Sequence, residues 1–230
     1  MSDHEHADAG QILSFMTTEH FNLQTERASA TAEVNGRLQL YMSTLSASLI
    51  TLALAAQLSD AGEGFRVFAL VLLPTVFVFG LVTIGRIGQA WVAWFTATQG
   101  MGRIRHYYTE IAPEMEPYFM MPTTDDPRHV LAGSGIGDRA PGWVQGLYTA
   151  PAAIAILNSI VAGVFVGLLS SIVVDGSMIA NGILGALGAV LCFVTKVAFG
   201  RKAFLRRLGA VESRFPPAGH TERENRPPAS

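Results

Sequence analysis

The sequence predicts an all-α membrane protein with four transmembrane helices and a helical cytoplasmic stalk formed by extensions of the first two helices. The main observation is a shortage of charge. The 230 residues include 16 Lys and Arg and 18 Asp and Glu, so charged residues make up 15% of the chain, whereas soluble domains usually contain about 25%. Four long stretches contain none of these residues. Because their apolar runs lack the period-two alternation of membrane β-strands, a β-barrel is excluded.

Each uncharged stretch is long enough to cross a bilayer as a helix. A helix of roughly 20 residues spans about 30 Å of hydrocarbon, and it satisfies its backbone hydrogen bonds internally. The predicted transmembrane segments are residues 38–59, 67–85, 148–174 and 176–195.

The basic residues lie almost entirely on one side of these segments. Of the 16 Lys and Arg residues, only Arg66 lies in a connection on the other side. The positive-inside rule therefore places both termini and residues 86–147 in the cytoplasm. Residues 1–10 are acidic and precede no apolar signal core, so we expect a retained, flexible N-terminus.

Two proline-free segments beside the membrane, residues 11–37 and 86–111, are predicted to be cytoplasmic helices that continue into the first two spans. Acidic residues recur every seven positions in the first segment, which is two helical turns, so they share one face. These residues are Glu19, Glu26 and Glu33. In the second segment, Gly100 and Gly102 are expected to break the helix.

These two cytoplasmic helices are expected to pack as an antiparallel stalk. If Arg37 and Arg86 lie level at the membrane surface, Glu19 comes opposite Arg103 to Arg105. The alignment predicts an ion pair between Glu19 and Arg103. The alternative is that both faces are merely solvated, since exposed ion pairs contribute only about 0 to 1 kcal/mol.

Residues 112–147 are predicted to be a cytoplasmic loop, because proline and glycine recur throughout them. Within the loop, Asp126 to Gly133 has the N-cap acid, the first-turn proline and the final glycine of a short helix. The acidic and histidine residues near and within the loop match no zinc or calcium spacing, so a solvated acidic loop is favoured over a metal site. These residues are His106, Glu114, Glu116, Asp125, Asp126 and His129.

The spans contain hydroxyl and small residues at helical spacing. They contain the thiol of Cys192 but no Asp, Glu, His, Lys or Arg, which argues against proton relays and ion-coupled transport. Small residues four positions apart let helices pack closely, and this interpretation is favoured. The alternative is that the hydroxyl stripe of the first span, which comprises Thr44, Ser48 and Thr51, lines a narrow pore in an oligomer together with Asn158 or Asn181. The helix-packing or pore-lining candidates are Thr44, Ser48, Thr51, Ser159, Gly163, Gly167 and Ser171.

Two features indicate contact with the membrane surface. Three aromatic residues that follow the second span are typical of an interfacial belt: Trp91, Trp94 and Phe95. Residues 196–214 are predicted to be a basic amphipathic helix attracted to anionic lipid headgroups. Its lipid-contacting residues are Arg201, Lys202, Arg206 and Arg207. Residues 215–230 are predicted to be disordered, and the net charge of −2 argues against nucleic-acid binding.

Three blocks of the sequence resemble a family of small actinobacterial integral membrane proteins. They are MTTEHFNLQTERASATAEVNGRLQLYMSTLSASLITLALAAQ, RIRHYYTEIAPEMEPYF and LNSIVAGVFVGLL. The resemblance covers most of residues 16–170. It implies the four-helix layout and a bacterial inner membrane, but no activity and no site residue.

The sequence favours a structural or regulatory role over catalysis. It contains no Ser/His/Asp, Cys/His or HExxH arrangement, so neither an enzyme nor a cofactor is expected. We expect a homo-oligomeric scaffold, sensor or regulator in the lipid bilayer, with a possible cytoplasmic protein partner. The alternative is a small oligomeric pore or channel.

Overall fold

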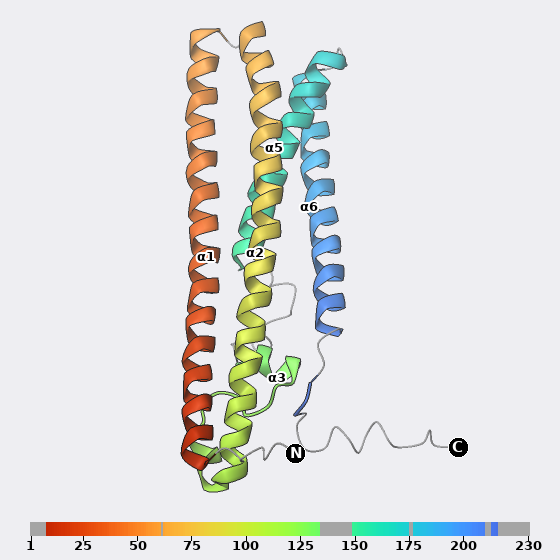
Figure 1. The fold of residues 1–230 in the computed structure, drawn as a ribbon. Helices are drawn as coiled ribbons and strands as arrows, with labels where there is room; N and C mark the ends of the chain where they lie inside the picture. The colour runs from red at the N-terminus through yellow and green to blue at the C-terminus, as the bar shows by residue number, and fades with distance from the viewer. Residues whose placement is uncertain (1–7, 61, 134–148, 175–176, 210–212, 216–230) are drawn as a thin grey trace, which may run out of the picture. The chain divides into compact units, whose positions relative to one another are not determined.

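The computed structural model describes residues 8–60, 62–133, 149–174, 177–209 and 213–215, and every regular element in them is helical. The predicted flexible segment 1–10 and tail 215–230 lie almost entirely outside these residues, as does the second half of the predicted loop, residues 134–147. The helices are α1 (Ala9–Leu58), α2 (Glu63–Ile111), the 3₁₀ helix η1 (Pro113–Tyr118), α3 (Pro127–Gly133), α5 (Ala150–Val173) and α6 (Met178–Gly209) (Figure 1).

Four of these helices, α1, α2, α5 and α6, are long and apolar enough to cross a membrane. Each includes all or most of one of the four uncharged stretches of the sequence. The predicted all-α fold with four membrane-crossing helices is therefore confirmed, and the chain has the character of a multi-pass membrane protein.

One predicted helix break and the predicted end of one helix differ from the structure. Helix α2 continues through Gly100 and Gly102 to Ile111, because an internal glycine weakens a helix by only about 1 kcal/mol and both glycines are packing sites. A Cβ on Gly100 would lie 2.8 Å from a methyl carbon of Leu23, and one on Gly102 would lie 2.5 Å from the Thr124 carbonyl oxygen. Helix α6 ends at Gly209 rather than at residue 214.

The chain divides into two compact units. Residues 32–90 and 142–207 form the first, which we call the membrane unit because it contains the four uncharged stretches. Residues 1–31, 91–141 and 208–230 form the second, which we call the loop unit.

The core of the membrane unit is built by α1, α2 and α5. Its buried residues are Tyr41, Leu45, Ala69, Leu73, Val76, Ile87, Ile154 and Val161. Helix α6 packs on α5 through glycine, because a Cβ on Gly163 would lie 2.6 Å from the Gly185 carbonyl oxygen, and one on Gly185 would lie 2.8 Å from that of Gly163. The two backbones therefore touch, as small residues permit in lipid.

The buried side-chain amide of Asn158 joins α1, α2 and α5. The Asn158 side chain of α5 is fully buried. Its Nδ2 donates to the Phe77 carbonyl oxygen of α2 at 3.1 Å, and its Oδ1 accepts from the Tyr41 hydroxyl of α1 at 3.5 Å. Gly80 makes room for this amide, since a Cβ there would lie 2.5 Å from Asn158 Cγ. A polar group in hydrocarbon must find its partners within the protein, so Asn158 fixes how α1, α2 and α5 meet.

Substitution of Gly80 by alanine is expected to destabilise the protein by about 1 to 3 kcal/mol, because the new methyl group overpacks against a hydrogen-bonded, buried side chain. The free energy of unfolding in mixed micelles measures the effect. Gly85→Ala is the matched control in α2, since a Cβ there meets nothing within 4 Å. In an Asn158→Ala background, Gly80→Ala should become neutral or stabilising, and an equal loss in both backgrounds would contradict this packing.

Candidate functional site

The loop unit is organised around the carboxylate of Asp125, whose side chain is 0% exposed. Four donors from two other parts of the chain reach its two oxygens. Oδ2 accepts from Arg103 Nε at 2.8 Å and from the Arg214 backbone N–H at 2.9 Å. Oδ1 accepts from Ser213 Oγ at 2.6 Å and from the Phe215 backbone N–H at 2.9 Å. We call this arrangement the Asp125 hub.

The local sequence explains why the loop reaches α2 at this point. Gly102 exposes a patch of bare helix backbone against which the Thr124 carbonyl group packs. One residue further on, the Asp125 carbonyl oxygen accepts a hydrogen bond from Gln99 Nε2 at 2.8 Å. Gln99 and Arg103 are one helical turn apart and share a face of α2. The helix thus holds both the backbone and the side chain of Asp125.

The electrostatics of Asp125 suit an anchor. Burial raises the pKa of this carboxyl group, but the hydrogen bonds from Ser213, from the backbone of Arg214 and Phe215 and from Arg103 outweigh burial and lower the pKa to about 2. Hydrogen bonds to the charged form have this effect in general. The carboxylate is therefore ionised at physiological pH, and its four donors hold the loop and residues 213–215 together.

An aromatic contact strengthens the attachment of residues 213–215. The ring of Phe215 lies 4.4 Å from that of His106, between centroids. His106 Nε2 lies 3.6 Å from a carboxylate oxygen of Glu110, one turn further along α2. The short segment after α6 is therefore held by α2 as well as by the loop.

The neighbouring residue Asp126 has a different role, which the sequence predicts. Its Oδ1 accepts from the backbone N–H groups of Arg128 at 2.8 Å and His129 at 3.2 Å, and so it caps the first turn of α3. The prediction of a solvated acidic loop is wrong at Asp125, because the carboxylate is buried among its donors. Among the described residues, no three His, Cys, Asp or Glu side chains could together hold a metal ion.

The predicted ion pair between Glu19 and Arg103 does not form. Arg103 bonds Asp125 instead, and within the described ranges Glu19 is exposed with no ion pair. The helix register is nevertheless close to the predicted one, since Leu23 lies against Gly100. A buried carboxylate gains far more from a guanidinium group than an exposed glutamate does, and this explains which partner Arg103 takes.

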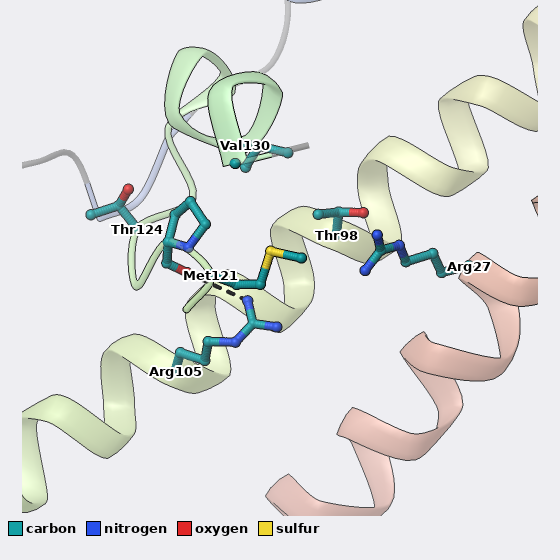
Figure 2. A pocket seen from close by; sticks show the side chains of 8 residues that line it. Arg27, Thr98, Arg105, Met121, Thr124 and Val130 are labelled. Carbon is teal, nitrogen blue, oxygen red and sulfur yellow. Dashed lines mark hydrogen bonds between the residues drawn. The ribbon is translucent and has the colours of Figure 1, made fainter. Parts of the chain in front are cut away.

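A small pocket lies beside the Asp125 hub, between α1, α2, the loop and α3 (Figure 2). Its volume of about 10 Å³ is near the lower limit for one ordered water. Figure 2 shows the Arg27 and Arg105 side chains reaching from α1 and α2 toward the same space, next to Met121 and Thr98. Arg105 donates to the Pro122 carbonyl oxygen at 3.4 Å. Burial, and then the charge of Arg27, lower the pKa of Arg105.

The aromatic residues beyond the second uncharged stretch also belong to the loop unit. The Trp91 ring lies 5.9 Å from that of Trp94 and 5.7 Å from that of Phe95, between centroids. Phe95 is buried, and the Arg27 guanidinium lies 5.1 Å from the centre of the Trp94 ring. This distance is typical of a cation–π contact. The group predicted to be an interfacial belt thus also supports a pocket arginine.

The hydroxyl stripe of α1 is satisfied within its own helix. Thr44, Ser48 and Thr51 donate to the carbonyl oxygens four residues earlier at 2.9, 2.8 and 2.8 Å. In α5, buried Ser159 donates to the Ala155 carbonyl oxygen at 2.6 Å, and Ser171 donates to that of Leu168 at 2.7 Å.

The other predicted site residues lie on α5 and α6. Gly163 and Gly167 both face α6, and a Cβ on Gly167 would lie 3.3 Å from the Asn181 carbonyl oxygen. Lys202 and Arg206 are exposed, whereas the side chains of Arg201 and Arg207 lie outside the described part of the chain. The small-residue ladder of α5 is therefore used inside one chain.

No family model, no curated protein and no solved structure matches this chain.

Substitution of Asp125 by asparagine is expected to release residues 213–215, because Asn offers one neutral acceptor and leaves Arg103 without its counter-charge. Trypsin should then cleave after Arg214 about tenfold faster than in the wild type, as measured by mass spectrometry of the detergent-solubilised protein. Asp126→Asn is the matched control, since that residue caps α3 and touches none of the three residues. Equal cleavage rates in wild type and Asp125→Asn would exclude the Asp125 hub.

The stabilisation by Asp125 should depend on pH. Its pKa in the fold is about 2, below the ordinary 3.8, so its contribution is complete above about pH 4 and is lost as the pH falls toward 2. The contribution is about 2 kcal/mol. The difference in unfolding free energy between wild type and Asp125→Asn should therefore shrink over this range. A difference that stays constant from pH 6 to pH 2 would contradict the ionised anchor.

Proposed function

We propose that this protein is an oligomeric scaffold, sensor or regulator of the bacterial inner membrane, and that it presents its loop unit as a helical stalk and loop in the cytoplasm. The placement of both termini in the cytoplasm rests on the distribution of basic residues. The bacterial membrane rests on the resemblance to the actinobacterial family. A scaffold, sensor or regulator of this kind requires no catalytic residue.

The Asp125 hub is the observation that carries this proposal. One buried carboxylate receives donors from α2 and from the segment after α6, and its own backbone is held by Gln99. Such an arrangement ties distant parts of the chain into one body. Since the Asp125 side chain is buried among donors that hold it ionised, the geometry favours the presentation of a surface.

An exposed stripe on α1 is the candidate oligomer interface. The α5 ladder is occupied by α6, but Ser43, Ala47 and Thr51 are all exposed and four residues apart. Small residues at this spacing let a second helix approach closely in lipid. Anionic headgroups are proposed to attract the exposed Lys202 and Arg206 of α6, and a cytoplasmic protein is the proposed partner of the loop unit.

A small oligomeric pore is the second candidate. It is favoured by an open cleft of about 460 Å³ between α5 and α6, lined by Gly167, Ser171, Met178, Asn181 and Gly182. It is opposed by the hydroxyl stripe of α1, whose donors bond their own helix. Ion current across planar bilayers, changed by Ser171→Leu, would support the pore. The absence of ion current over a wide range of voltage would favour the scaffold.

The oligomer is tested by light scattering of the protein in detergent and by native mass spectrometry in nanodiscs. We expect one defined oligomer for the wild type. Ala47→Leu should weaken it at least tenfold, because the larger side chain keeps a neighbouring helix away. Ala53→Leu is the matched control, since Ala53 is also exposed on α1 but lies off the stripe. A wild type that is monomeric at all concentrations would overturn the proposed assembly.

A further inference from the structure

We propose that Arg27 and Arg105 form a binding site for a phosphate group in the loop unit. Both residues line the same small pocket, Arg27 from α1 and Arg105 from α2 (Figure 2). A bound phosphate would be the ligand of the sensor, and in that respect the inference rests on the proposed function. The binding itself stands on the geometry of the pocket.

The first argument is that neither arginine has an acidic partner among the residues that the structure describes. In the described ranges the ion pairs join Glu33 to Arg37 and Arg86, Asp125 to Arg103, and His106 to Glu110. Arg27 contacts the Trp94 ring, and Arg105 makes one long bond to a carbonyl oxygen. A guanidinium group has five N–H donors, so most donors of both residues meet no acceptor among the described residues.

The second argument is the electrostatic repulsion between the two positively charged side chains. The charge of Arg27 acts on Arg105 strongly enough to lower its pKa, in addition to burial. Two cations in a partly buried site repel one another unless an anion lies between them. The arrangement is therefore costly without a ligand and favourable with one.

The third argument is that a nearby histidine also has an N–H group without a hydrogen-bond acceptor in the described structure. His20 lies on α1, two turns before Arg27 and on the same face. Burial, and then the charge of Arg105, lower the pKa of His20. Its Nε2 accepts from the amide Nε2 of Gln24 at 3.1 Å, which leaves the proton on Nδ1. That nitrogen is buried and has no hydrogen-bond partner in the described structure.

The geometry of the pocket indicates the class of ligand. Planar guanidinium groups bind carboxylate and phosphate through paired N–H donors, and two of them match an oxyanion with three terminal oxygens and up to two charges. The enclosed space of about 10 Å³ is too small for a whole phosphate group. The anion therefore sits at the mouth of the pocket with the rest of the ligand outside it, as in a soluble phosphomonoester or the headgroup of phosphatidic acid.

Calorimetric titration of the full-length protein with inorganic phosphate tests the site, in nanodiscs of zwitterionic lipid at constant ionic strength. We expect saturable binding of one phosphate per chain. Arg27→Gln and Arg105→Gln should each weaken it at least tenfold. Arg128→Gln is the matched control, because Arg128 is exposed on α3 in the same unit. Absence of saturable binding, or an equal loss in the control, would overturn the site.

Further measurements separate the other possibilities. Arg105→Lys keeps the charge without the planar fork and should still bind more weakly than the wild type; wild-type affinity in this variant would contradict paired recognition. Protection of the Phe215 amide from hydrogen exchange shows that a variant is folded. Nanodiscs with phosphatidic acid should abolish phosphate binding if the natural ligand is a lipid headgroup, and leave it unchanged if the ligand is soluble. A protein that forms the oligomer but binds no phosphate would reject the phosphate site and leave the proposed assembly standing. A protein that is monomeric but binds phosphate would reject only the proposed assembly.

Discussion

The loop unit depends on the cost of placing a carboxylate where water cannot reach it. An isolated ion in a protein interior loses several kcal/mol of hydration energy, so a chain that buries Asp125 must bring donors to both oxygens. Arg103 supplies a charge, and the segment after α6 supplies two backbone N–H groups and a hydroxyl. Each donor fixes the position of the element that carries it. The path of the loop and the attachment of residues 213–215 both follow from this one requirement.

In the membrane unit, too, a buried polar side chain must find hydrogen-bond partners within the protein, but here the side chain is neutral. Asn158 is fully buried in a unit whose other buried side chains are mostly apolar, and its amide bonds the Phe77 carbonyl group and the Tyr41 hydroxyl. Gly80 is the complement that this amide needs, because any side chain there would occupy the same space. A single polar residue thus specifies a packing arrangement that leucine and valine alone would leave loosely defined.

Properties that act along the chain could be predicted from the sequence. The spans follow from the absence of charge over about 20 residues, since lipid acts on composition and length. The start of α3 follows from Asp126 and Pro127, because a helix cap involves only the next turn. The partner of Arg103 could not be predicted in this way. Asp125 lies 22 residues from Arg103 and 88 from Ser213, and no local pattern marks which of several carboxylates is buried.

The role of a glycine in a helix is also difficult to predict from the sequence, because it depends on contacts with residues far away along the chain. Gly100 and Gly102 resemble helix breakers in the sequence, yet their lack of a side chain serves contacts with Leu23 and Thr124. The phosphate pocket is equally hidden, because Arg27 and Arg105 are separated by most of α1 and α2. A signal for Arg27 does exist, since it lies two turns from His20 on one helix face.

Amide hydrogen exchange at Arg214 and Phe215, in the wild-type protein in nanodiscs at neutral pH, tests the Asp125 hub most directly. Both amides donate to the Asp125 carboxylate, so both should be protected at least a hundredfold relative to an unstructured peptide, although no helix contains them. Exchange of either amide at the rate of an unstructured peptide would show that the carboxylate does not hold this segment.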